Sequence, residues 1–361
     1  MIYLDYQATT PLAPEAREAM LRWLGGPEDG GFGNPHSPHV LGREAGAAVD
    51  WAREQVAALF PPGGRVIFTS GATEALNIAL RGAEAVRGGA LVAVSAIEHA
   101  AVLDTAQALP GGAQILPVNR EGLVDAQVPL PEGVGLVAVM QVNNEIGTIQ
   151  PVAELAARAR ATGALFLCDA VQAAGKLPLA QADMIAISAH KFHGPKGIGA
   201  LWVREGVELA PLVTGGGQEG GLRSGTLSPA LCAGMGAAAE LALARRDEDA
   251  AHVAALWARA RELFGGWTLN GSAEARYRGN LNLRREGLDV ARLMADVRGV
   301  AFSAGSACAS GSGRPSHVLS AIGLLPREAR GSIRLGFGRY TQIDSLERAA
   351  EMITVAAAQQ G

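Results

Sequence analysis

The sequence has little of several features that would mark a specialised class of protein. It has only three cysteines in 361 residues, Cys168, Cys232 and Cys308, which are too few and too scattered for a disulfide framework or a CxxC metal site. The formal net charge is −4 and no long block of Lys and Arg is present, which argues against direct binding to nucleic acid. No apolar run approaches the ~20 residues that a membrane span requires.

Targeting signals and repeats are also missing. The opening run MIYLDYQATTPLAPEA lacks the basic leader and the apolar segment of a secretory signal peptide. We therefore expect a reducing, cytoplasmic location, which agrees with the small number of cysteines. The chain shows no repeat of fixed period, and its Gly-rich, 48% hydrophobic composition is typical of an α/β protein.

Short apolar segments alternate with helical stretches from about residue 65 onward. The expected strands cover 66–69, 91–95, 135–142, 164–170, 183–188 and 197–203. Strands that are buried on both faces read as continuous apolar runs, and helices between them imply parallel pairing. The pattern predicts an α/β fold with a doubly wound, mostly parallel sheet between helices.

The pattern changes after residue 228. An Ala-rich helical region over 229–264 leads into strand 280–284, helix 289–297, strand 300–304, helix 315–323, strand 332–337 and helix 345–360. This order predicts a second, α+β domain of roughly 120 residues, which is a normal domain size.

Polar residues follow several of the expected strands, where ligands bind in open α/β sheets. They are Thr73, His99, Asn144, Asp169 and Lys191. Each has a structural alternative: Thr73 can be an ordinary residue of a first helical turn and His99 a structural histidine. Asp169 can be the ion-pair partner of an arginine.

Lys191 carries the most specific chemistry of these residues. A lysine at the end of a buried strand loses solvation, which disfavours its charged form and makes it a good nucleophile for a carbonyl cofactor. Its alternative is a surface charge at a strand exit. A lysine, an acid, an amide, a histidine and a helix N-terminus for phosphate are together what pyridoxal phosphate requires. The combination predicts a site for that cofactor.

The chain resembles the cysteine desulfurases, which are pyridoxal phosphate enzymes of fold type I and class V aminotransferase type, nearly from end to end. The matching runs include YLDYQATTPL (3–12), FGNPHSPH (32–39), FTSGATEALN (68–77), VNNEIGTIQP (142–151), CDAVQAAGKLP (168–178), SAHKFHGPKGIGAL (188–201), GGGQEGGLRSGT (215–226), SAGSACAS (303–310) and SIRLGFGRY (332–340). The resemblance implies a homodimer whose large domain (14–245) holds a seven-stranded sheet. The small domain (1–13 and 246–361) would carry the loop of the catalytic cysteine.

The resemblance also implies a role for each matching residue. Lys191 would form the Schiff base with pyridoxal phosphate, and His99 would stack on the ring and move protons. The other cofactor residues would be Asp169 at the ring nitrogen, Gln172 at the ring oxygen, Asn144 beside the ring, and Ala72, Thr73, Ser188, His190 and Thr226 of the partner subunit at the phosphate. Arg334 would clamp the substrate carboxylate by a bidentate contact, with Asn34 nearby.

Cys308 differs from the other two cysteines. Cys168 lies in an apolar strand and Cys232 in an Ala-rich helix, where free cysteines are usually buried. Cys308 lies among small polar residues, and a reactive thiol needs exposure. Gly305 and Gly311 permit the loop to move. Cys308 is therefore the expected acceptor of sulfur.

The implied activity is removal of sulfur from L-cysteine, which leaves L-alanine and a persulfide on Cys308. The sulfur would pass to an acceptor protein for iron–sulfur cluster assembly or for thiolation of tRNA or a cofactor. No resident metal is expected, apart from a transient iron–sulfur contact through that persulfide. Only 27 residues follow Arg334, so we do not expect docking of a scaffold protein through a C-terminal extension.

Two alternatives remain from the sequence. One is a selenocysteine lyase or a related pyridoxal phosphate lyase or aminotransferase, although an aminotransferase has no use for Cys308. The other is a sulfur carrier that has lost its cofactor, which the presence of Lys191, Asp169 and His99 opposes.

Overall fold

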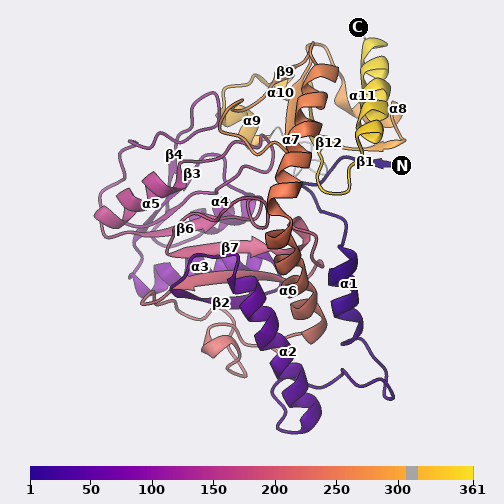
Figure 1. The fold of residues 1–361 in the computed structure, drawn as a ribbon. Helices are drawn as coiled ribbons and strands as arrows, with labels where there is room; N and C mark the ends of the chain where they lie inside the picture. Colours follow the sequence, from indigo (N-terminus) through magenta and orange to yellow (C-terminus); the bar gives the residue numbers. More distant parts are fainter. Residues whose placement is uncertain (306–315, 361) are drawn as a thin grey trace.

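The computed structural model describes residues 1–305 and 316–360. A seven-stranded sheet lies at the centre of the larger part of the molecule (Figure 1). In spatial order the strands are β2 (Gly64–Thr69), β8 (Gly199–Arg204), β7 (Met184–Ser188), β6 (Leu165–Asp169), β5 (Val134–Ala138), β3 (Leu91–Ser95) and β4 (Ala113–Leu116). The expected α/β architecture is confirmed. No helix in the described part of the chain is long and apolar enough to cross a membrane.

Strand direction follows from the connections. The five strands from β7 to β4 pair in parallel, whereas β8 runs antiparallel between β7 and β2. The segment between β7 and β8 is short, and antiparallel neighbours need no crossover helix. All six strands expected from the apolar runs are present. Strand β4 was not anticipated, because its two central residues are exposed and interrupt the apolar pattern.

Helices cover both faces of this sheet. Residues of α1 (Pro14–Leu21), α2 (Val40–Ala57), α5 (Val152–Ala161) and α6 (Pro229–Ala244) join one hydrophobic cluster, and residues of α3 (Ala72–Val86) and α4 (Ala100–Gln107) join the other. Side chains alternate across a strand. Phe68 accordingly packs in the first cluster and its neighbour Ile67 in the second.

A separate hydrophobic cluster forms around the four-stranded antiparallel sheet of β12 (Ser303–Ala304), β13 (Ser332–Gly336), β10 (Asn280–Arg284) and β9 (Thr268–Leu269). The helices of this part are α7 (Arg246–Leu263), α8 (Val290–Asp296), α9 (His317–Ala321), α10 (Pro326–Arg330) and α11 (Ile343–Ala358). Strand β1 (Ile2–Tyr3) pairs in parallel with β11 (Val300–Ala301), so the N-terminus lies here, near the C-terminal helix (Figure 1). The expected strand 300–304 is divided into β11 and β12 by Phe302.

Candidate active site

One cavity of about 520 Å³ lies at the carboxyl ends of the parallel strands. Strand β8 is antiparallel to both of its neighbours, β7 and β2, so β7 and β2 run in the same direction. Their last residues, Ser188 and Thr69, therefore lie at the same edge of the sheet, where both pair with Gly199. Ten of the residues proposed from the sequence line this cavity: Ala72, Thr73, His99, Asn144, Asp169, Gln172, Ser188, His190, Lys191 and Arg334.

Lys191 ends the short 3-10 helix Ala189–Lys191, directly after β7. Its Nζ donates hydrogen bonds to the backbone carbonyls of Gln7 (2.6 Å) and Ala8 (2.9 Å). The amine is therefore held by the N-terminal segment and faces the cavity that it lines. The alternative of a freely solvated lysine at a strand exit does not fit this geometry.

Asp169 is the last residue of β6 and is only 6% exposed. Its Oδ1 accepts a hydrogen bond from the Val171 N–H (3.0 Å), and no arginine in the described part of the chain forms an ion pair with it. Burial raises the pKa of Asp169, against the influence of that N–H, His99 and Lys191. A buried carboxylate needs a positively charged or hydrogen-bonding partner, and a protonated ring nitrogen would supply it.

His99 is the N-cap residue of α4. Its Nδ1 accepts the N–H of Ala101 at 3.1 Å, so the neutral ring carries its proton on Nε2. The helix start thus fixes both the ring and its tautomer, with the N–H group on Nε2.

A cluster of hydrogen-bond donors lies where β2 passes into α3. The helix begins at Ala72 after Gly71, and the N–H groups of a first helical turn have no partner within the helix. The hydroxyls of Thr73 and Ser188 line the same part of the cavity. A Cβ atom at Gly199 would lie 2.7 Å from the carbonyl carbon of Gly71, so this close approach requires glycine.

His190 completes this end of the cavity. Its Nδ1 lies 3.1 Å from Thr9 Oγ1. Burial lowers the pKa of His190 to about 4, with a contribution from Lys191, so the ring is neutral at neutral pH. It therefore acts as a hydrogen-bonding group and not as a charge.

Arg334 lies in the middle of β13 and is fully buried. Its Nη2 donates to Asp5 Oδ1 (2.7 Å) and its Nη1 to the carbonyl of Asn144 (3.1 Å). Its Nε has no hydrogen-bond partner in the part of the chain that the structure describes. A guanidinium with an unused donor at a cavity wall is suited to a carboxylate.

The chemistry of these groups fits pyridoxal phosphate. Lys191 offers an amine for its aldehyde, Asp169 a buried carboxylate for its ring nitrogen, and the N-terminus of α3 a set of N–H donors for its phosphate.

Two residues proposed from the sequence, Asn34 and Thr226, do not line the cavity of the single chain. Asn34 is exposed, and its Oδ1 accepts the N–H of His36. Thr226 is exposed in the loop before α6. Cys308 lies outside the described residues. The other two cysteines are free and buried, as expected, and burial raises the pKa of both, that of Cys232 to about 12.

Sequence reasoning missed several residues of the site. Gln7 and Ala8 bind Lys191 through backbone carbonyls, which no side-chain pattern reveals. Asp5 forms an ion pair with Arg334. The one feature of the sequence that could have pointed to a role for Asp5 is that it is a charged residue among apolar neighbours. Lys196 also lines the cavity.

The family model for aminotransferase class-V matches residues 2–348. The chain is 41% identical to a cysteine desulfurase IscS of Rickettsia akari over 376 aligned positions, covering 98% of this chain and 90% of that one. A solved NifS-like protein superposes with a TM-score of 0.91 at 31% identity, covering 99% of both chains. SspA, solved in complex with cysteine, superposes with a TM-score of 0.83 at 34% identity, covering 95% of this chain and all of that one. The chain therefore belongs to the aminotransferase class-V family, among the cysteine desulfurases.

Proposed function

We propose that the protein uses pyridoxal phosphate to remove sulfur from L-cysteine, leaving L-alanine and a persulfide on Cys308. The observation that carries the proposal is that Lys191, Asp169 and Arg334 line one cavity. An amine, a buried acid and a buried guanidinium are together the groups that hold this cofactor beside an amino acid. The relative solved in complex with cysteine supports the same substrate.

Several residues would hold the cofactor. Lys191 would bind its aldehyde carbon, Asp169 its ring nitrogen and Gln172 its ring oxygen, with His99 and Asn144 beside the ring. Its phosphate would be held by Ala72, Thr73, Ser188 and His190, together with Thr226 of the partner subunit. When bound, pyridoxal phosphate supplies an electron sink that stabilises negative charge at the Cα of an amino acid.

The chain itself would position the substrate and move its protons. Arg334 would hold the substrate carboxylate and thereby orient Cα towards the amine of Lys191, which would accept the Cα proton. The imidazole of His99 would transfer a proton near the sulfur atom of the substrate. The thiolate of Cys308 would attack the sulfur atom of the substrate, so that the S–S bond of the persulfide forms as the C–S bond breaks.

A comparison of two proteins tests the proposal. Wild type loaded with pyridoxal phosphate is expected to convert L-cysteine to L-alanine, with one added sulfur atom on Cys308 in the mass spectrum. The Cys308→Ser variant should keep the bound cofactor but lose both products. Protein that stays colourless after addition of the cofactor would contradict the proposal. So would undiminished sulfur release from Cys308→Ser without added thiols.

We further propose a homodimer in the cytoplasm that passes the persulfide sulfur to an acceptor protein for iron–sulfur clusters or for thiolation of tRNA or a cofactor. Support for the dimer comes from the exposed position of Thr226, outside its own cavity. The two buried free thiols suit a reducing compartment. Sedimentation tests the dimer, and trapping a mixed disulfide at Cys308, with mass spectrometry of the bound protein, tests the acceptor.

We also propose that the chain forms two domains. The large domain comprises residues 14–245, and the small domain comprises residues 1–13 and 246–361. The separate hydrophobic clusters support this division, as does the break between α6 and α7 at residue 245. Limited proteolysis near residues 13 and 245 tests it, with recovery of residues 14–245 as a folded unit as the expected result.

A further inference from the structure

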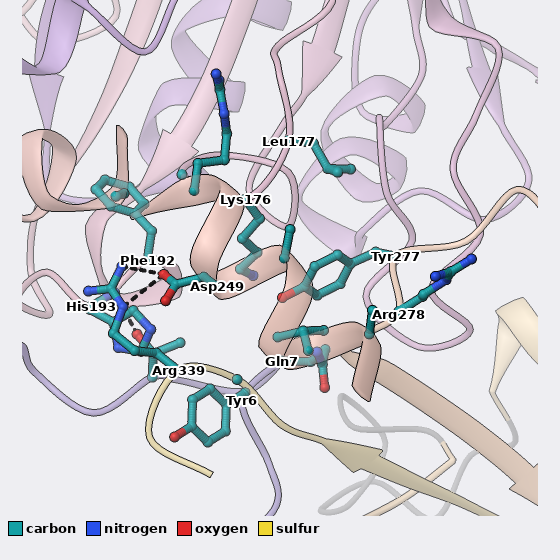
Figure 2. A pocket seen from close by; sticks show the side chains of 18 of the residues that line it. Tyr6, Gln7, Lys176, Leu177, Phe192, His193, Asp249, Tyr277, Arg278 and Arg339 are labelled. Atoms are coloured by element: carbon teal, nitrogen blue, oxygen red, sulfur yellow. Dashed lines mark hydrogen bonds and ion pairs between the residues drawn. The ribbon is translucent and has the colours of Figure 1, made fainter. Parts of the chain in front are cut away.

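A second cavity, of about 350 Å³, adjoins the first, and Gln7 lines both. Figure 2 shows the side chain of Lys176 extending into it between Asp249 and Tyr277. The Nζ of Lys176 lies 5.2 Å from the centre of the Tyr277 ring, a cation–π contact. None of the roles assigned to the first cavity uses this lysine.

The other charged groups that are buried in the second cavity already have partners. Arg339 donates to Asp249 (2.6 Å), and Arg276 donates to the backbone carbonyls of Ser272, Asn270 and Asn280. Lys176, in contrast, forms no ion pair with any described residue. Its side-chain hydrogen bond goes to Oε1 of Gln172, at 3.4 Å. The amine thus faces a residue of the first cavity.

Gln172 connects the two cavities through its amide. Its Oε1 receives the Lys176 hydrogen bond, and its Nε2 donates to the backbone carbonyl of Gln7 at 3.0 Å. That same carbonyl accepts from Lys191 at 2.6 Å. Lys176, Gln172, Gln7 and Lys191 therefore form one continuous chain of hydrogen bonds.

Only one orientation of the Gln172 amide satisfies both neighbours. Rotated by half a turn, the amide would place N–H groups against the Lys176 amine and its oxygen against the carbonyl of Gln7. One contact would then place two donors together and the other two acceptors, because an ammonium cannot accept a hydrogen bond and a carbonyl cannot donate one. In the observed orientation Nε2 keeps a second N–H for the cavity that Gln172 lines.

The composition of the chain supports a specific need for an amine here. The sequence has 28 arginines and only three lysines, Lys176, Lys191 and Lys196. The last two line the first cavity, and Lys176 is one hydrogen bond away from it. The two residue types are not interchangeable, because the ammonium is a compact donor whereas the guanidinium is a broad fork.

We propose that Lys176 is a positioning residue that fixes the amide of Gln172, so that the second N–H of Nε2 points to the ring oxygen of bound pyridoxal phosphate. The inference rests on the cofactor site of the proposed function. Burial lowers the pKa of Lys176 to about 7, with a smaller contribution from Lys191. As an ammonium the amine excludes the rotated amide, and as a neutral amine it still donates to Oε1 of Gln172.

The test is the visible absorption of the holoenzyme, titrated with pH in the absence of cysteine. In Lys176→Met the amide can rotate, and the ring oxygen loses a donor that stabilises its deprotonated form. The midpoint of the titration is then expected to rise by about one pH unit. Gln172→Ala should show the same rise, and Lys176→Met in the Gln172→Ala background should add nothing. Lys176→Arg, which keeps donor groups but replaces the compact ammonium by a broad fork, should recover only part of the wild-type midpoint.

An unchanged midpoint in Lys176→Met would overturn the inference, and so would additive shifts in the double variant. Thermal unfolding of the apoproteins checks that the variants fold. If Lys176→Met does not fold, Lys176→Ala replaces it, since its shorter side chain only enlarges the neighbouring cavity. Wild type that binds no cofactor would instead refute the proposed function, so the two failures are distinguishable.

Discussion

Arg334 and Asp5 form an ion pair of 2.7 Å between residues 329 positions apart. The guanidinium is almost completely buried, whereas the carboxylate keeps some contact with solvent. Asp5 thus holds in place the side chain proposed to bind the substrate carboxylate.

Asp5→Ala should lower the free energy of unfolding by about 2–3 kcal/mol, because it leaves a buried guanidinium without its carboxylate. The KM for L-cysteine should rise about tenfold as Arg334 loses its position. Asp5→Asn keeps an oxygen acceptor and should recover part of both effects. Denaturant unfolding and steady-state kinetics measure them, and equal values for Asp5→Ala and wild type would contradict the prediction.

Gly199→Ala should weaken binding of pyridoxal phosphate by tenfold or more. The added Cβ would lie 2.6–2.8 Å from backbone atoms of Ile187 and Gly71, which cannot move without shifting the start of α3. Overpacking of this kind costs about 1–3 kcal/mol. Gly266→Ala is the matched control, because no atom lies within 4 Å of a Cβ there. Fluorescence titration of the apoproteins with the cofactor measures the difference, and equal affinities for the two variants would refute the explanation.

His99 combines two roles that substitutions can separate. His99→Ala should lose the N-cap of α4, which costs about 1 kcal/mol of stability, as well as the Nε2–H group. His99→Asn can still cap the helix but offers no imidazole. Both variants should release sulfur from cysteine about 10²–10⁴-fold more slowly, whereas only His99→Ala should unfold more easily. Single-turnover kinetics and thermal unfolding distinguish the roles, and normal turnover in His99→Asn would count against proton transfer by the ring.

Glu98 should make stability depend on pH. Its Oε1 accepts hydrogen bonds from Ser95 (2.5 Å) and from the Met140 N–H (2.8 Å), and burial raises its pKa from 4.5 to about 8. Between these values the folded state binds more protons than the unfolded state. The free energy of unfolding should therefore fall as pH rises, by at most about 1.4 kcal/mol per pH unit.

Glu98→Gln removes this titration while keeping the shape of the side chain. The difference in unfolding free energy between wild type and the variant should narrow or reverse in favour of the variant from pH 5 to pH 8. Urea unfolding at several pH values measures it. Parallel curves for the two proteins would show that Glu98 is ionised in the folded state throughout.

The sequence was most informative where local pattern and chemistry coincide. The continuous apolar run 91–95 predicted β3 to the residue, and the alternating run NLNLR predicted β10 equally well. The side chains that follow β7, β6 and β3 could be grouped because parallel strands end at one edge of a sheet. Hence Lys191, Asp169 and His99 were placed together correctly.

Contacts made by the backbone, or across long separations, could not be predicted in this way. The hydrogen bonds from Lys191 end on carbonyls of residues 7 and 8, which every sequence possesses. The Asp5–Arg334 pair depends on how β13 meets the N-terminal segment. The role of Lys176 required the orientation of one amide, which no spacing of residues encodes.

The contacts of the N-terminal segment also bear on how the protein matures. Asp5 and Gln7 are synthesised long before their partners Arg334 and Lys191. A nascent chain that has not yet reached β13 therefore lacks half of these contacts. Closure of this end of the cavity therefore waits until β13 has been synthesised.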